Sequence, residues 1–212
     1  MKTYLQLTGL ALAIILSGCS KNKDKNRNTF ADNFSDQTWS GLVQYKTISR
    51  ADPYTILFRR DNTFIWTDRS GQTPGNYSLN ETDKKITLNF TGGKFVTIAT
   101  KGDTTMASID YSPGTQWTLY SFEKNYSASE SIINTKWKSS RSGLTIEFSS
   151  SIDVNYLAGT KWTYTKEGSF IHGNCAALYS DIYMVINKNK LQALNVLIFQ
   201  SDPYYYDEFN RQ

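Results

Sequence analysis

Short runs of alternating apolar and polar residues are the feature that most constrains how this 212-residue chain can fold. From Trp39 onward these runs are five to eight residues long, and they are bounded by Gly, Asn, Asp and Ser. Alternation with a period of two is typical of half-buried strands, and connections this short leave no room for crossover helices. The sequence therefore predicts an all-β fold made of antiparallel strands.

The first half of the chain is predicted to form a meander. Tyr54–Phe58 and Thr63–Thr67 are expected to pair as a hairpin, because Asp61 and Asn62 between them suit the backbone conformations of a turn. Further strands are expected over Gly75–Leu79, Ile86–Phe90, Phe95–Ala99, Thr105–Ile109 and Gln116–Phe122.

The second half repeats this pattern with shorter loops. Trp137 corresponds to Trp39, and Leu144–Phe148 corresponds to Thr55–Phe58. Gly159–Thr163 corresponds to Gly75–Leu79, Lys190–Val196 to the strand ending at Ile109, and Phe209–Gln212 to Phe122–Asn125. We predict an internal duplication, giving two tandem barrels or one larger barrel. The alternative is that two β stretches rich in turn residues look alike without common origin.

The N-terminal segment has the pattern of an export signal. A positive start is followed by the apolar run Leu5–Leu16, which is too short to cross about 30 Å of hydrocarbon. The sequence Leu16-Ser17-Gly18-Cys19 resembles the lipobox of bacterial lipoproteins. This resemblance implies that residues 1–18 are a cleaved signal peptide and that Cys19 carries the acyl anchor, palmitate included. The alternative is an ordinary secretory signal with a chance cysteine.

Residues 19–35 are expected to form a flexible tether after the anchor. The segment is polar and charged, and Phe30 and Phe34 are its only large apolar residues. An acidic run directly after the cysteine would resemble the surface-export signal of Bacteroidetes lipoproteins, and residues 20–25 contain no such run. We therefore expect the protein in the cell envelope, lipid-anchored in the outer membrane and facing the periplasm.

The order of strands after the tether resembles the small lipocalin-like domains of Bacteroidetes lipoproteins. The resemblance lies in Trp39, Ile56–Phe58, Asp61–Trp66, Gly75–Leu79 and Lys85–Phe90. It implies two small antiparallel meander barrels, spanning residues 36–124 and 135–212, with residues 125–134 as the linker. The basic residue of the final strand is displaced to Lys124 and Arg211. A barrel of this size is expected to be filled by its own aromatic side chains.

Charge excludes one class of function. The chain has 23 basic and 19 acidic residues. Five of the basic residues and one of the acidic residues precede residue 28, which leaves 18 of each in residues 28–212. A protein that binds nucleic acid needs a basic surface to neutralise phosphates. We therefore expect no nucleic-acid partner.

Catalytic and metal-binding patterns are weak throughout the chain. His172 is the one histidine, and Cys175 is the one cysteine besides Cys19, whereas a structural metal site usually needs three or four such ligands. There is no Gly-x-Ser-x-Gly nucleophile motif and no Gly-x-x-x-x-Gly-Lys phosphate loop. We therefore expect no enzyme activity, no metal and no cofactor. The minor alternatives are a reactive Cys175 thiol, an ion held by His172 and Cys175, and a hydrolase using paired carboxylates.

Aromatic residues near polar partners are the most usable functional signal, because such rings stack on sugars and also suit protein contacts. The candidate ligand-binding residues are Trp66, Trp117, Tyr120, Trp162, Tyr164, Tyr204 and Tyr206. The first hypothesis is a non-catalytic binding lipoprotein that takes a small amphipathic molecule or a glycan at a barrel mouth or aromatic surface. The second is a structural or accessory subunit of an envelope assembly that uses its Tyr-rich face. The alternative is that these Tyr and Trp residues are present because they favour strands and fill the ends of the barrels.

Overall fold

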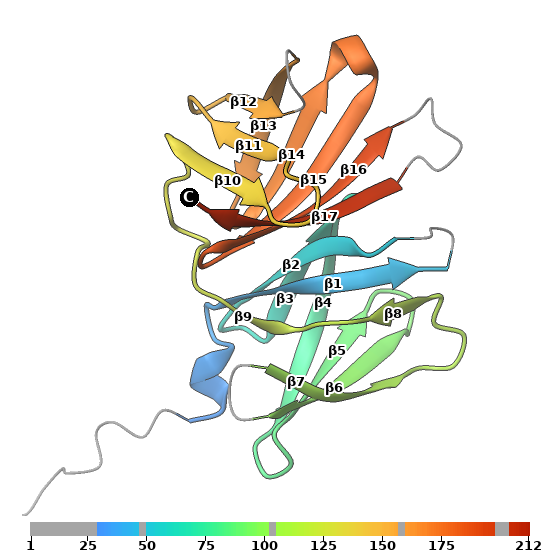
Figure 1. Cartoon of the computed structure of the whole chain (residues 1–212). Helices are drawn as coiled ribbons and strands as arrows, with labels where there is room; N and C mark the ends of the chain where they lie inside the picture. The colour runs from blue at the N-terminus through green and yellow to red at the C-terminus, as the bar shows by residue number, and fades with distance from the viewer. Residues whose placement is uncertain (1–28, 47–49, 102–104, 157–159, 198–203) are drawn as a thin grey trace, which may run out of the picture.

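The computed structural model describes residues 29–46, 50–101, 105–156, 160–197 and 204–212. The predicted signal peptide, Cys19 and most of the tether lie outside these residues. The described chain is all-β and forms two closed antiparallel barrels in tandem, which confirms the predicted fold class (Figure 1).

The first barrel follows the predicted meander. Its strands are β1 (Thr38–Tyr45), β2 (Asp52–Phe58), β3 (Thr63–Asp68), β4 (Gly71–Asn80), β5 (Lys85–Phe90), β6 (Phe95–Lys101), β7 (Thr105–Tyr111), β8 (Trp117–Leu119) and β9 (Glu123–Asn125). Strands β8 and β9 pair with opposite ends of β1 and so share one strand position. Because β1 also pairs with β2, the sheet closes with eight strand positions.

The second barrel has the same up-and-down order. Its strands are β10 (Thr135–Ser139), β11 (Thr145–Phe148), β12 (Asp153–Tyr156), β13 (Lys161–Glu167), β14 (Phe170–Cys175), β15 (Ser180–Asn187), β16 (Lys190–Leu197) and β17 (Tyr204–Arg211). Pairing of β10 with β17 closes this barrel, and the 3₁₀ turn η2 (Ala176–Leu178) connects β14 to β15.

Side-chain alternation places one face of each strand in a barrel interior. In β10, Trp137 is buried, while its neighbours Lys136 and Lys138 are exposed. The largest fully buried side chains are mostly aromatic, and Trp39 and Trp137 are among them. The interiors are therefore packed with the strands' own apolar side chains, as expected for barrels of this size.

The C-terminal part of the predicted tether differs from the expectation. Residues 29–35 pack against the first barrel through the 3₁₀ turn η1 (Ala31–Asn33), and Phe30 and Phe34 are both buried. The Phe34 ring stacks on Trp39 with centroids 4.7 Å apart, and the Trp39 indole N–H donates to the Asn33 carbonyl. Two phenylalanines bury enough apolar surface to hold this short segment in place.

The two barrels share a strand register, which supports the predicted duplication. Trp39 lies opposite Ile56 in the first barrel, and Trp137 lies opposite Ile146 in the second. On their other sides, the same tryptophans face Lys124 and Arg211, as the sequence correspondence predicts. The Arg211 guanidinium lies over the Trp137 ring, 5.8 Å from its centroid.

The barrels pack side by side rather than end to end. The outer face of β1 and β2 contacts β15 and β16 (Figure 1). The Asn125 side chain donates to the Ile186 carbonyl at 2.8 Å, and the Asn187 side chain donates to the Lys124 carbonyl at 3.2 Å. In return, Asn187 accepts from the Tyr126 backbone N–H. We call Asn125 and Asn187, with these bonds, the asparagine clasp.

The predicted linker is closely attached to both barrels. Asn125 belongs to β9, and the Ser127 hydroxyl accepts from the backbone N–H of Lys188 at 2.7 Å. Ile132 is buried in the core of the second barrel. Within the described residues, no helix has the length and apolar character needed to cross a bilayer.

Candidate functional site

Two of the predicted ligand-binding residues meet inside the mouth of the first barrel. The Trp66 and Trp117 rings lie 5.6 Å apart, next to Phe90. Trp66 is also stacked on Tyr54, at 4.0 Å, and is almost fully buried. These rings therefore pack against one another and serve as core.

Tyr120 lies apart from this cluster. Its side chain is 54% exposed, and its hydroxyl donates to the Gln44 side chain on the barrel exterior. Leu119 precedes it inside the barrel, so Tyr120 points outward by the alternation of the strand.

The predicted aromatic residues of the second barrel are also core. Trp162 is fully buried, and its indole N–H donates to the Thr160 hydroxyl at 3.0 Å. Tyr164 is buried, and its hydroxyl donates to the Ser150 carbonyl at 2.8 Å. Both polar groups are thus satisfied within the barrel, as buried Trp and Tyr require.

Tyr204 and Tyr206 lie on the outward face of β17 and are half-buried. The Arg69 guanidinium of the first barrel lies over the Tyr204 ring at 5.7 Å. The Tyr206 hydroxyl donates to Glu208 at 2.6 Å, and burial raises the pKa of this tyrosine. The seven predicted residues therefore lie in several separate places and do not form one site.

Buried polar groups accompany the aromatic rings at the mouth of the first barrel. Asp68 accepts hydrogen bonds from the Tyr45 hydroxyl and from the Trp66 indole N–H. Asp52 is fully buried and accepts from the Arg69 guanidinium at 2.5 Å. Burial raises the pKa of Asp52 to about 7, because it outweighs the opposing effect of Arg69.

The second barrel has a polar cluster in the corresponding mouth. Asp207 is buried and accepts from the hydroxyls of Ser139 and Ser142. Nearby, the Ser180 hydroxyl and the Tyr156 hydroxyl both contact Asn195. Burial raises the pKa of Tyr156 to about 12. These groups satisfy one another, so the cluster serves to order the strand ends.

His172 and Cys175 do not converge. They lie on opposite faces of β14: Cys175 is buried in the core, and His172 points outward. His172 Nε2 lies 2.8 Å from Asp181, and its ring stacks on Tyr183 at 4.7 Å. Among the described residues, no group of three or more His, Cys, Asp or Glu is placed to hold a metal ion.

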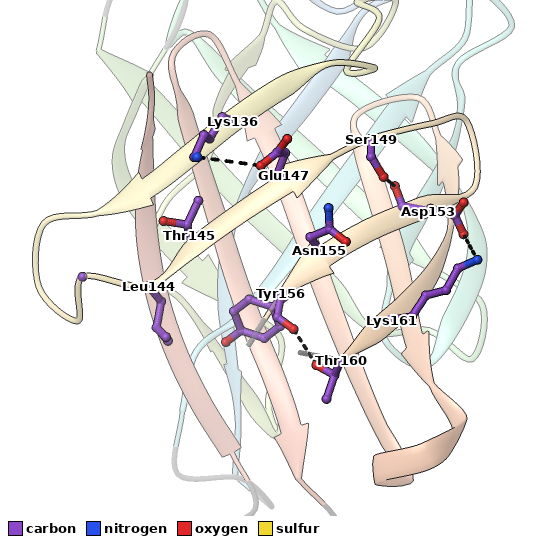
Figure 2. Close-up of a pocket in the computed structure, with 11 residues that line it drawn as sticks. Lys136, Leu144, Thr145, Glu147, Ser149, Asp153, Asn155, Tyr156, Thr160 and Lys161 are labelled. Atoms are coloured by element: carbon purple, nitrogen blue, oxygen red, sulfur yellow. Dashed lines mark hydrogen bonds and ion pairs between the residues drawn. The ribbon is translucent and has the colours of Figure 1, made fainter. Parts of the chain in front are cut away.

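A groove of about 690 Å³ lies open on the outside of the second barrel and is the candidate site (Figure 2). It crosses the outer face of β10, β11, β12 and β13. We call it the polar groove, and its lining residues are Lys136, Gly143, Leu144, Thr145, Glu147, Ser149, Asp153, Asn155, Tyr156, Thr160 and Lys161.

Two ion pairs lie in the polar groove. Lys136 Nζ lies 3.7 Å from Glu147, and Lys161 Nζ lies 3.3 Å from Asp153. In Figure 2 the Asn155 side chain lies between these pairs. Both lysines are well exposed, and exposed ion pairs contribute little to stability, so these groups can exchange partners readily. The groove can therefore offer charged and amide hydrogen-bond groups to a polar ligand.

The polar groove is not among the predicted sites, because those predictions rest on aromatic residues. The available signal was the polar outward positions of three successive short strands, such as Lys136, Glu147 and Asn155. Such positions are common on solvated strand faces, so the pattern alone does not distinguish a groove from an ordinary surface.

No protein-family model matches the chain, and no curated protein or solved structure matches it.

Proposed function

We propose that this protein is a lipid-anchored, non-catalytic binding protein of the bacterial cell envelope that holds a glycan in the polar groove of its second barrel. The observation that carries the proposal is the groove itself, whose volume of about 690 Å³ falls in the range of small-molecule sites. Its lysines, carboxylates and Asn155 supply both donors and acceptors, which hydroxyl-rich ligands require.

Charged groups strengthen this proposal. A hydrogen bond to an ionised group is roughly twice as strong as a neutral one, and Glu147 and Asp153 can each accept two hydroxyl donors. Their lysine partners can donate to the same ligand. A ligand that spans the groove would therefore replace weak exposed ion pairs by several charge-assisted bonds.

The alternative function, an accessory subunit that uses a Tyr-rich face, has less support. Tyr204 already packs under Arg69, and Tyr206 already bonds Glu208 within the molecule. The aromatic rings of both barrel mouths are similarly used as core. We therefore place the binding function on the outer surface of the second barrel rather than at a mouth or on β17.

Glycan binding can be tested by calorimetry with soluble oligosaccharides of two to four sugar units, selected first on a glycan array. We expect Glu147→Gln to lower the affinity roughly tenfold, because it removes the charge that strengthens the hydrogen bonds to the ligand. Asn155→Ala should lower it roughly fivefold, because it removes the amide and its hydrogen bond of about 1 kcal/mol. Glu123→Gln, an exposed change on the first barrel, is the matched control and should bind as the wild type does. If no glycan binds, or if both groove variants bind normally, the proposal fails.

The anchor requires a separate experiment. In a bacterial host, the wild type should partition with the membrane fraction and incorporate labelled palmitate, because acylation at Cys19 supplies the buried methylenes. Cys19→Ala should move to the soluble fraction and lose the label. Label retained in this variant would place the acyl group elsewhere and contradict the proposal.

A further inference from the structure

A cleft of about 340 Å³ lies in the seam between the two barrels. One wall is the outer face of β2 and β3. The opposite wall is the linker at Ala128–Ser129 and the β13–β14 turn at Glu167–Ser169. We call it the seam cleft. Its far end adjoins a second hollow of about 220 Å³, which shares Thr67, Gln72 and Glu167 with it.

Ser169 supplies the strongest sign that the seam cleft binds a ligand. This residue is fully buried and lines the cleft, and its hydroxyl has no hydrogen-bond partner among the described residues. Buried polar groups in folded proteins are nearly always paired. The turn that presents Ser169 is set by Gly168, whose φ of +58° favours glycine.

The remaining walls of the cleft define the chemistry of its ligand. Thr55 and Thr67 add two more hydroxyl-bearing side chains, and both residues are buried. Leu57 and Ile65 give the same wall an aliphatic surface, and Leu57 is 43% exposed. The cleft therefore combines an aliphatic surface with a row of hydroxyls.

The charges that line the seam cleft balance. Arg59 is the basic residue and Glu167 the acidic residue, and Glu167 already accepts a hydrogen bond from Gln72 across the seam. An anionic or cationic ligand would therefore gain one favourable and one unfavourable charge interaction. We propose that the seam cleft binds a small neutral amphipathic molecule with an aliphatic body and one or two hydroxyl or amide groups.

Binding there has a consequence for the whole molecule, because the ligand touches both barrels. Leu57 and Thr55 belong to the first barrel, and Ser169 belongs to the second. A molecule held between them stabilises the packed arrangement by mass action. Ligand binding should therefore raise the unfolding temperature of the whole protein.

The test uses probes of equal chain length and different charge. The whole protein is titrated with the neutral probes 1,2-hexanediol and hexanamide, and in parallel with the charged probes hexanoate and hexylammonium. Binding is followed by saturation-transfer NMR. We expect the neutral probes to bind roughly tenfold more tightly than both charged probes, because only the neutral probes match the balanced charge of the cleft. Equal binding of all four probes, or no binding of the neutral pair, would overturn the proposal.

Two variants locate the site. Ser169→Ala should weaken hexanediol binding roughly fivefold with no loss of thermal stability, since it removes a hydroxyl that has no protein partner. Leu57→Glu should weaken it roughly tenfold, because it places a charge on the aliphatic wall. Ser78→Ala, an exposed serine on β4, is the matched control.

Glu147→Gln separates this proposal from the glycan groove, since it should leave hexanediol binding unchanged. Normal binding by both Ser169→Ala and Leu57→Glu would show that the probes bind elsewhere.

Discussion

At the scale of single residues, the two barrels fill one core position with opposite choices of side chain. Phe64 lies opposite Gly75 in the first barrel, and the equivalent pair in the second is Val154 opposite Trp162. A Cβ atom on Gly75 would lie 2.4 Å from the Phe64 ring and 2.6 Å from the Asn89 carbonyl oxygen. The large side chain thus lies on the first strand of the pair in one repeat and on the second strand in the other.

This packing predicts the effect of a single methyl group. Gly75→Ala should destabilise the protein by about 1–3 kcal/mol, because the methyl group overpacks the site. Phe64→Val in the same molecule should recover part of the loss by making space for it, as a denaturant double-mutant cycle would measure. Asn76→Ala, the exposed next residue, is the control. Additive effects of the two core changes would contradict the exchange of volume.

Asp52 predicts a pH dependence of stability. Its pKa in the folded protein is about 7, above the value of about 3.9 expected when unfolded, so the folded state holds more protons between these values. The associated stability is fully present below about pH 4 and is lost as the pH rises through about 7.

The matching variant is Asp52→Asn, which cannot ionise. From about pH 4 to 8, we expect the unfolding free energy of the wild type to fall by at least about 1 kcal/mol relative to this variant, measured by urea unfolding. Parallel pH profiles for the two proteins would contradict the prediction, because they would show that Arg69 keeps the Asp52 carboxylate ionised over the whole pH range.

At the scale of strands and turns, the repeats share a tyrosine that fastens the β2–β3 hairpin and its counterpart, β11–β12. The Tyr77 hydroxyl donates to the Arg59 carbonyl at 2.8 Å, and its backbone N–H donates to the Asn62 carbonyl at 2.8 Å. Tyr164 does the same with Ser150 and Ile152, again at 2.8 Å for both bonds. The same tyrosine therefore secures the same hairpin turn twice.

Equivalent geometry predicts equivalent energetics. Tyr77→Phe and Tyr164→Phe should each lower the unfolding free energy by about 0.5–1.5 kcal/mol, because each removes one hydrogen bond without changing the packing. Tyr120→Phe, on the exposed surface, should change it less. A large loss in one repeat and none in the other would show that the two tyrosines have different roles.

Most strands could be predicted from local sequence, and the exceptions have physical causes. The turn at Asp61–Asn62 is confirmed: Asn62 has a φ of +62°, and Asp61 accepts from the Thr63 backbone N–H. The predicted strand over Gln116–Phe122 is shorter in the structure, where β8 ends at Leu119 and the next strand, β9, begins only at Glu123. The Tyr120 backbone N–H donates to Leu42, and the Gly41 position abuts the Ser121 carbonyl, so the strand bends there.

Matching the repeats by sequence also placed one pair of strands out of step. The sequence correspondence paired Gly159, which lies outside the described residues, with Gly75, and therefore Trp162 with Ser78. The strand registers instead match Trp162 with Gly75 and Tyr164 with Tyr77. Glycine is a poor guide here because Gly75 is a packing residue on a strand. The tyrosine hydrogen bonds give the true correspondence.

At the scale of the whole molecule, the asparagine clasp joins the two barrels by hydrogen bonds. Asn125 is buried and bonds Ser40 in the first barrel, Ser127 in the linker and Ile186 in the second barrel. We therefore expect the clasp to couple the unfolding of one barrel to that of the other.

Removing the clasp should separate the barrels in calorimetry. Asn125→Ala is expected to lower stability by roughly 1–3 kcal/mol, because it leaves buried partners unpaired, and to resolve the unfolding peak into two. Asn174→Ala, which removes a single exposed bond to Asp181, should retain the wild-type profile. A single unshifted peak for Asn125→Ala would show that the barrels are coupled through their other contacts.

The sequence by itself determined the all-β class, the antiparallel meander and its repetition in two tandem barrels. These follow from period-two alternation and turn residues such as Asp61 and Asn62, which act over a few neighbouring residues. Only the tertiary structure decided that Trp66 and Trp162 are core, and that the polar groove and seam cleft exist. A groove depends on which outward faces meet, and strands such as β2 and β13 are brought together only when both barrels close and pack.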